Sequence, residues 1–342
     1  MIQEISPPFA KERQGGIFEI RRGIVMNFLV TGGAGFIGSH LVERLLAQGH
    51  RVLCLDNFDE FYDPALKRRN LRHALEDPKF RLIEGDLREE RILEKIFEEE
   101  KIDIVAHLAA RAGVRPSIQN PLLYAEVNIR GTLNLLEACR KHPIGRLVFA
   151  SSSSVYGNNL KIPFAENDPV DNPISPYAAT KKAGELICHT YHHLYGIHIA
   201  CLRYFTVYGP RQRPEMAIHQ FTRLIHEGEK VTLFGDGSSR RDYTYIDDAV
   251  AGTMEALIQA KGYEIYNIGE SRTISLLELI RTIEERMGKK ALLEYLPAQP
   301  GDVERTYADI RKASERLGYR PQTKIQEGIE RFVRWYLEEG RI

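Results

Sequence analysis

A glycine-rich turn between a strand-like segment and a helical pattern constrains the fold of this chain more than any other feature. Residues 27–31 (NFLVT) are short and apolar, and they run directly into Gly32-Gly33-Ala34-Gly35-Phe36-Ile37-Gly38. From Phe36 to Gln48 apolar residues recur at helical spacing, and Gly49 ends the pattern. A strand that turns at once into a helix is typical of the strand–helix–strand units that build parallel sheets.

The same alternation continues through the first 205 residues. Further segments rich in Val, Ile and Leu occupy 51–56, 81–85, 103–108, 146–151 and 198–203. Helical patterns separate these segments, which predicts an α/β fold with a doubly wound parallel (Rossmann) sheet covered by helices on both faces.

The pattern changes after about residue 205. Helical patterns at 214–228, 247–260, 275–287 and 324–338 then mix with short strands and loops. We therefore expect a dinucleotide-binding domain over residues 26–205 and a smaller mixed α/β substrate lobe over 206–342, with some chain crossing between the two.

Residues 1–25 carry no periodic pattern. They mix charges with Pro7-Pro8 and Gly15-Gly16, and they lack the apolar core of a signal peptide. Arg21-Arg22-Gly23 is compatible with a ribosome-binding sequence in the gene just before Met26, which opens the first strand. We hypothesise that translation starts at Met26 and that this extension is a mis-assigned start.

Composition excludes several classes of protein. The chain has 47 basic and 47 acidic residues among 342, so it has no electrostatic footprint for nucleic acid or for a membrane surface. No apolar run approaches the roughly 18 residues of a membrane span. The four cysteines are far apart, which predicts free thiols in the cytoplasm and no metal site or disulfide framework.

The glycine turn predicts a dinucleotide site. Gly32 makes the tight turn, Gly35 lets the backbone approach a pyrophosphate, and Gly38 lets helix and strand pack closely. The helix start supplies free N–H groups to phosphates. Asp56 ends the second strand 18 residues after Gly38, where its carboxylate would bind ribose hydroxyls and repel a 2′-phosphate, which favours NAD over NADP. The predicted cofactor-binding residues are Gly32, Gly35, Phe36, Ile37, Gly38, Asp56, Asn57, Asp86, Leu87, Leu108, Ala109, Ala110, Tyr177 and Lys181.

A tyrosine and a lysine four residues apart form the candidate catalytic pair. Tyr177 and Lys181 share one face of a predicted helix. A serine cluster, 151–154, ends the fifth strand, and the carboxyl ends of such strands are where these sheets bind ligands. We expect Lys181, with the nicotinamide charge, to lower the phenol pKa of Tyr177 from near 10, so that tyrosinate takes a proton from a substrate hydroxyl whose carbon gives hydride to NAD⁺. The alternative is that both residues are ordinary helix surface.

These segments together resemble the extended short-chain dehydrogenase/reductase family, in its nucleotide-sugar epimerase and dehydratase branch. The resemblance covers residues 26 to about 338 and includes TGGAGFIGSH (31–40), SSSSVYG (151–157), YAATKKAGE (177–185) and RRDYTYIDD (240–248). It implies that Ser152 takes the catalytic Ser/Thr position, with Tyr177 as base and Lys181 as its partner. It also implies nucleotide contacts for Arg241 and Asp302, support of the site from the region of Asn128, and dimers formed through helices at 121–140 and 176–195.

Two serines favour an epimerase over a dehydratase. In the 4,6-dehydratases of this branch an Asp-Glu pair follows the catalytic serine position, whereas this chain has Ser153 and Ser154, which cannot titrate near neutral pH. The resemblance therefore implies oxidation at C4, rotation of the bound 4-ketose and return of the hydride to the opposite face.

The choice of sugar depends on finer similarities. Segments 55–70, 109–121, 205–217 and 299–303 are most similar to UDP-glucuronate 4-epimerases. A 4-keto-glucuronate is a β-keto acid prone to lose CO₂, and a fixed arginine fork would hold its carboxylate. Arg213 is the first candidate and Arg211 the second, although both could instead be solvated or bind phosphate. The predicted substrate-binding residues are Ser152, Ser153, Ser154, Tyr177, Thr206, Arg213, Arg241 and Asp302.

Other functions stay open at the level of sequence. The chain could act on UDP-glucose or UDP-N-acetylglucosamine, or be a nucleotide-sugar dehydrogenase, reductase or dehydratase of the same fold. A non-catalytic dinucleotide-binding regulator is a third class, but it would have no need of the intact Ser152, Tyr177 and Lys181 set.

Overall fold

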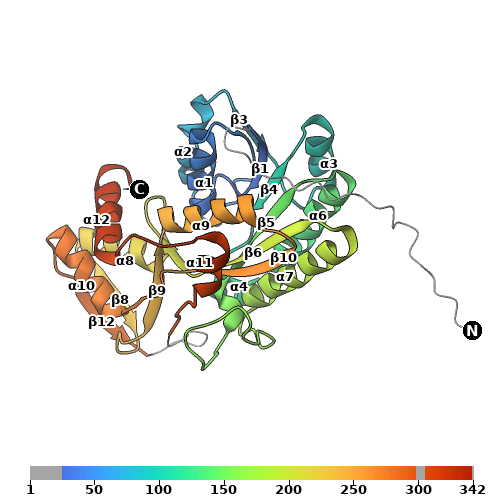
Figure 1. The fold of residues 1–342 in the computed structure, drawn as a ribbon. Coiled ribbons are helices and arrows are strands. Elements are labelled where there is room, and N and C mark those ends of the chain that lie inside the picture. The colour runs from blue at the N-terminus through green and yellow to red at the C-terminus, as the bar shows by residue number, and fades with distance from the viewer. Residues whose placement is uncertain (1–24, 298–304, 341–342) are drawn as a thin grey trace, which may run out of the picture.

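The large sheet contains seven parallel strands. The computed structural model describes residues 25–297 and 305–340. The strands lie side by side in the order β10-β6-β5-β4-β1-β2-β3 (Figure 1). Their bounds are β1 Asn27–Thr31, β2 Arg51–Asp56, β3 Phe80–Glu84, β4 Ile104–His107, β5 Arg146–Ser152, β6 His198–Tyr204 and β10 Tyr263–Ile268. This arrangement confirms the predicted doubly wound α/β fold.

Helices cover both faces of this sheet because successive side chains of each strand point to opposite sides. Phe28 and Val30 pack in one apolar core with the residues of α1 (Phe36–Ala47) and α9 (Ile246–Gln259). Leu29 belongs to the opposite core. That core includes α3 (Glu90–Glu99), α6 (Gly131–Lys141) and α7 (Pro176–Tyr195). Between these elements lie α2 (Pro64–Asn70), α4 (Val114–Gln119) and α5 (Pro121–Ala125).

Two small sheets build the C-terminal lobe. One has the order β11-β9-β7 and the other pairs β12 with β8 (Figure 1). The strands are β7 Thr206–Tyr208, β8 Lys230–Phe234, β9 Arg240–Tyr245, β11 Thr273–Ser275 and β12 Leu292–Leu296. The helices of this half, besides α9, are α8 Ala217–Glu227, α10 Leu276–Met287, α11 Arg311–Leu317 and α12 Ile325–Trp335.

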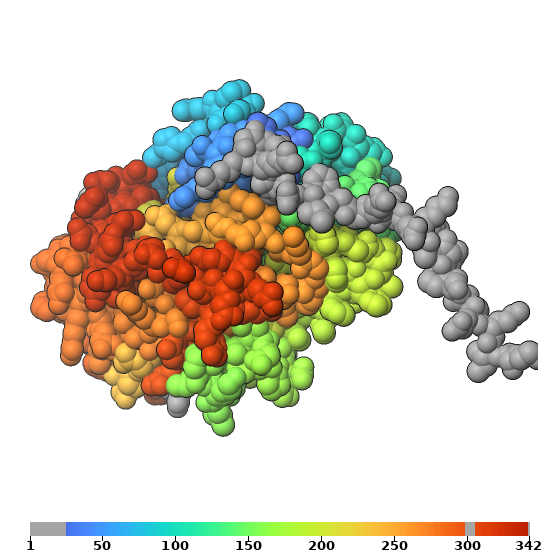
Figure 2. Space-filling model, in the orientation of Figure 1, coloured from blue at the N-terminus to red at the C-terminus, as the bar shows by residue number. Residues whose placement is uncertain are grey.

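The chain crosses back from the C-terminal half to the large sheet. β10 pairs in parallel with β6 at the sheet edge, and α9 packs against α1. Residues 246–268, which form α9 and β10, thus pack against the large sheet. In the space-filling view, orange atoms of the C-terminal half therefore lie directly against blue atoms of the N-terminal half (Figure 2). The strand β10 was absent from the sequence prediction, since its segment YEIYNI has no helix-flanked Val/Ile/Leu run.

Two expectations fall on parts of the chain that are not described. The hypothesised mis-assigned extension lies outside the described residues except for Val25, and so does Asp302. Within residues 25–297 and 305–340, every helix is too short or too polar to span a bilayer.

Candidate active site

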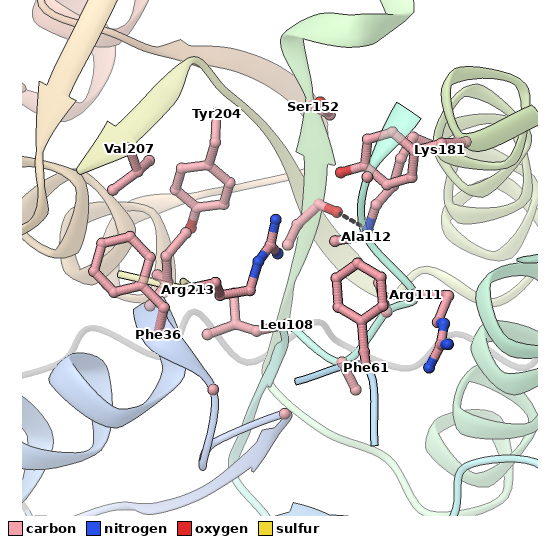
Figure 3. A pocket seen from close by; sticks show the side chains of 18 of the residues that line it. Phe36, Phe61, Leu108, Arg111, Ala112, Ser152, Lys181, Tyr204, Val207 and Arg213 are labelled. Atoms are coloured by element: carbon pink, nitrogen blue, oxygen red, sulfur yellow. Dashed lines mark hydrogen bonds between the residues drawn. The ribbon is translucent and has the colours of Figure 1, made fainter. Parts of the chain in front are cut away.

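A cavity of about 650 Å³ lies at the carboxyl ends of the large-sheet strands and is lined by residues from both halves of the chain (Figure 3). Its lining includes all the predicted cofactor, catalytic and substrate residues that the structure describes. Six basic and four acidic side chains are among the lining residues. The cavity therefore has a net positive lining, which suits ligands with phosphate groups.

The glycine turn forms a cradle that larger residues would fill. Gly32 has a φ of +71°, and a Cβ there would lie 2.6 Å from the backbone nitrogen of Ala109. Gly35 caps helix α1 without a side-chain bond, and the first turn of α1 has no acidic residue. The first N–H groups of the helix are therefore available to an anion such as a pyrophosphate.

Gly38 gives the first testable prediction. A Cβ at this position would lie 2.2 Å from the carbonyl oxygen of Gly32, which is backbone and cannot move aside cheaply. We expect Gly38→Ala to displace the turn and reduce the NAD that copurifies with the protein by at least about tenfold. Cofactor released by heat and quantified by chromatography measures this. Gly196→Ala is the control for backbone strain away from the cavity, because Gly196 has a φ of +69° at the end of α7 and a Cβ there meets nothing within 4 Å. Gly38→Ala protein with a full complement of NAD would contradict the assignment.

Asp56 and Asp86 occupy the ends of β2 and β3 as expected. Asp56 accepts hydrogen bonds from the backbone N–H of Ala34 (3.0 Å) and Phe58 (2.9 Å). Burial raises its pKa, which these two bonds partly offset. Asp86 is held by Asn57 and Arg88, and its hydrogen bonds with Arg88 lower its pKa to about 2. Both carboxylates are therefore fixed at the rim where adenosine would lie.

Tyr177, Lys181 and Ser152 come together at the base of the cavity. Ser175 caps helix α7 and Pro176 opens it, so Tyr177 and Lys181 lie one turn apart on the same face. The Ser152 hydroxyl is close enough to the Tyr177 phenol to lower its pKa. Lys181 extends from α7 toward β5 (Figure 3), and its Nζ donates to the Ala150 carbonyl at 2.6 Å.

Lys181 lies over the Tyr177 ring, as the helix spacing predicted, while its expected lowering of the Tyr177 pKa together with a nicotinamide charge stays a prediction. The ammonium lies 5.9 Å from the Tyr177 ring centroid and is held by the Ala150 carbonyl. Burial raises the pKa of Tyr177, while Ser152 and the positive charge of Arg213 lower it in part. Burial also lowers the pKa of Lys181 to about 8.

Asn128 supports the site, as the resemblance implied. It lies in a π-helical turn, 126–130, between α5 and α6. Its side chain accepts from the Arg111 N–H (2.7 Å) and donates to the Arg111 carbonyl and to Thr180 on α7 (3.0 Å each). One residue thus fixes the loop after β4 against the catalytic helix, a frequent use of π-turns at functional sites.

The two candidate arginines behave differently. Arg213 projects into the middle of the cavity, between Tyr204 and the Ser152–Lys181 side (Figure 3). Its Nε donates to Glu215 at 2.7 Å. Arg211 is not a lining residue, because its guanidinium turns to Glu43 on α1 at 2.7 Å. The second candidate of the sequence analysis is therefore wrong.

Sequence reasoning missed one wall of the cavity. The loop after β2 contributes Phe61, Tyr62 and nearby Lys67, and the loop after β4 contributes Arg111. The Arg111 guanidinium lies 4.8 Å from the Phe61 ring centroid. The rule that ligands bind at strand ends could have indicated both loops, because each directly follows a strand end.

Three polar atoms on the lining support a fit to polar ligands. The Tyr62 hydroxyl, Arg111 Nε and Ser154 hydroxyl are buried without a hydrogen-bond partner among the described residues. Buried polar groups are normally satisfied. Together with the glycine cradle and Asp56, these atoms make the cavity suitable for NAD and a phosphorylated sugar.

Comparisons with known proteins agree with this geometry. The family described as GDP-mannose 4,6 dehydratase matches residues 29–332. A UDP-glucuronate 4-epimerase from Thermodesulfobacterium geofontis is 47% identical over 312 residues, 91% of this chain and 96% of that protein.

Two solved structures have folds closely similar to that of this chain. The UDP-glucuronic acid 4-epimerase of Bacillus cereus, in complex with UDP-glucuronic acid and NAD, has a TM-score of 0.86 and 40% identity over 92% of this chain and 99% of that one. The UDP-glucose 4-epimerase of Thermotoga maritima has the same TM-score at 35% identity, over 92% of this chain and 100% of that one. Since the family model and these relatives span nearly all of the described fold, the chain belongs to the GDP-mannose 4,6 dehydratase family of extended short-chain dehydrogenases/reductases.

Proposed function

We propose that this chain is an NAD-dependent isomerase that interconverts UDP-glucuronate and UDP-galacturonate by inverting C4. The observation that carries the proposal is the convergence of Tyr177, Ser152 and Arg213 in the cavity that the glycine turn also lines. The relatives named for UDP-glucuronate support this sugar over others.

Tyr177 is the proposed acid and base of the reaction. Its phenolate takes the proton of the C4 hydroxyl during oxidation and returns it during reduction. The Ser152 hydroxyl holds the same substrate oxygen and stabilises the phenolate, because it lowers the Tyr177 pKa. Lys181 keeps the end of β5 in place through the Ala150 carbonyl. When bound, NAD accepts the hydride from C4 and gives it back.

Ser153 and Ser154 support epimerisation without loss of water. Both line the cavity at the position where the dehydratases carry their acid pair. A hydroxyl does not ionise near neutral pH, so it cannot serve as the acid that eliminates the C6 hydroxyl. These hydroxyls can donate hydrogen bonds to a carboxylate instead, and that of Ser154 has no other partner among the described residues.

Arg213 is the proposed ligand of the substrate carboxylate. A guanidinium matches a carboxylate with two parallel N–H bonds. Holding that carboxylate in place would disfavour loss of CO₂ from the 4-keto acid. Thr206 and Arg241, which also line the cavity, are proposed to contact the sugar and the nucleotide.

Incubation with three substrates tests the function. UDP-glucuronate, UDP-glucose and UDP-N-acetylglucosamine are supplied separately without added cofactor, and the product sugars are identified after hydrolysis. We expect galacturonate to form fastest and no net change in absorbance at 340 nm, whereas a dehydratase would release a 4-keto sugar. Deuterium at C4 of the substrate should remain in the product, and its loss to solvent would contradict the proposal.

Substitution of Arg213 gives the second prediction. Arg213→Ala should raise KM for UDP-glucuronate by roughly 10- to 100-fold, because one charge-assisted bidentate contact is lost. It should also let a fraction of turnovers release CO₂, measured with substrate labelled in the carboxylate. Binding of UDP alone should change less than about twofold, since UDP has no sugar carboxylate. An unchanged KM would show that Arg213 serves another group.

A homodimer is proposed on the face of α5, α6 and α7. Leu122, Leu186 and Leu194 on this face have exposed fractions of 78%, 57% and 59%. Exposed apolar patches of this kind mark interfaces. Leu136 of α6, by contrast, is fully buried in the core. Light scattering should give twice the mass of one chain, and Leu186→Arg should halve it.

The four free, buried thiols fit the proposed location in the cytoplasm.

A further inference from the structure

The loop that carries Arg213 is attached to the helix that follows the glycine turn. This loop, residues 209–216, joins β7 to α8. Nε2 of His40 on α1 lies 2.9 Å from the Pro210 carbonyl oxygen. Because a carbonyl only accepts, the ring must carry its hydrogen on Nε2. One turn further along α1, Glu43 pairs with Arg211 at 2.7 Å.

The loop backbone is unusual at the residues that these contacts hold. Arg211 is a non-glycine residue with a φ of +65°, a conformation that costs of the order of 1 kcal/mol and persists where its surroundings impose it. Gly209 has a φ of +142°, and a Cβ there would lie 2.4 Å from Ile246. Gln212 then bonds to the Val207 carbonyl at 3.1 Å.

His219 fixes the far end of the loop. Its ring Nδ1 lies 2.7 Å from the Gln212 carbonyl, and its backbone N–H donates to the Gln212 side chain at 3.2 Å. The backbone next to Arg213 is therefore held on one side by α1 and on the other by His219 of α8. Of these two sides, only α1 belongs to the dinucleotide-binding domain.

We propose that His40 and Glu43 are positioning residues for Arg213. Helix α1, which follows the dinucleotide-binding turn, would thereby also fix the position of the arginine that binds the sugar carboxylate. The inference rests on the proposed function of Arg213. An α-helix is rigid over one turn, so the distance from the glycine turn to the loop is fixed. The side chains of Arg211 and Glu43 are 16% and 31% exposed, which limits screening of their pair by solvent. Burial, together with the charge of Arg211, lowers the pKa of His40 to about 4, so the ring stays neutral and its contact persists near neutral pH.

Three variants remove the attachment without touching the cavity. Glu43→Gln removes the charge, Arg211→Gly removes the guanidinium while relieving the positive φ, and His40→Phe keeps a ring but removes the donor. We expect each to weaken binding of UDP-glucuronate about three- to tenfold by calorimetry on the NAD-containing enzyme. Binding of UDP and the amount of bound NAD should stay within about twofold of wild type.

Matched controls separate positioning from general damage. Glu227→Gln disrupts an ion pair on α8 that is far more exposed, and it should leave both affinities unchanged. His40→Gln restores a donor at a similar place and should recover most of the loss. Adding Glu43→Gln to Arg213→Ala should not weaken the binding of UDP-glucuronate any further, because Glu43 acts through Arg213.

The outcomes distinguish this inference from the proposed function. If Arg213→Ala weakens the binding of UDP-glucuronate but not of UDP, and the α1 and Arg211 variants do not, the positioning role is wrong and the proposed function stands. Equal losses for UDP and UDP-glucuronate in those variants would also overturn it, because they would show a structural defect. If Arg213→Ala itself has no selective effect, the carboxylate assignment fails.

Discussion

Replacing Tyr177 by Phe is expected to lower kcat for UDP-glucuronate epimerisation by roughly 10³-fold, the usual range for loss of a general acid–base. Only one oxygen is removed, so helix α7 and the cavity shape should be preserved. Ser152 and the positive charge of Arg213 both lower the pKa of this phenol, which agrees with its proposed role as acid and base. Affinity for UDP-glucuronate and the content of NAD should change little.

Tyr124→Phe is the matched control for this experiment. Tyr124 packs edge-to-face against Tyr177, with ring centroids 6.2 Å apart, and its hydroxyl donates to the Ala112 carbonyl at 2.5 Å. Because that hydroxyl is already used by the backbone, its removal should lower kcat less than about tenfold. The assay is product-sugar analysis at saturating substrate. Tyr177→Phe enzyme with full turnover would overturn the acid–base assignment.

Arg203→Met should destabilise the protein by about 3–5 kcal/mol, the typical cost of leaving a buried charge without its partner. Arg203 on β6 and Glu185 on α7 are 1% and 0% exposed and form a two-pronged pair at 2.8 Å. Glu185 also accepts from Ser151, the neighbour of Ser152 on β5, at 2.6 Å. The pair therefore supports the strand end that carries Ser152, the serine proposed to be catalytic.

The free energy of unfolding from denaturant titration measures this effect. Arg223→Met is the control, because Arg223 forms an exposed ion pair with Glu227 and should cost less than about 1 kcal/mol. The double variant Arg203→Met with Glu185→Leu should recover much of the loss, because the uncompensated charge is gone. A single Arg203→Met variant within about 1 kcal/mol of wild type would contradict the role of this pair.

The sequence predicted most strands and the glycine turn because these features depend on residues that are adjacent in the chain. Short apolar runs predicted six of the seven strands of the large sheet within a residue or two, because such a run is a property of adjacent residues. Gly32, Gly35 and Gly38 also indicated the cofactor turn, because backbone freedom is a property of the residue itself. β10 was missed because its segment YEIYNI has no run of Val, Ile and Leu, so that only its pairing with β6, about 60 residues away, identifies it as a strand.

The candidate site divides in the same way between sequence and structure. Residue types and spacing alone determined that this chain has a dinucleotide turn, a Tyr177–Lys181 pair on one helix face and serines at a strand end. Tertiary structure alone decided that Lys181 bonds to the Ala150 carbonyl, that Arg213 enters the cavity, and that Arg211 turns to α1. Spacing fixes neighbours within an element, whereas the direction of a long charged side chain depends on partners in other elements, such as Ala150 on β5 for Lys181 and Glu43 on α1 for Arg211, which only the folded chain brings close.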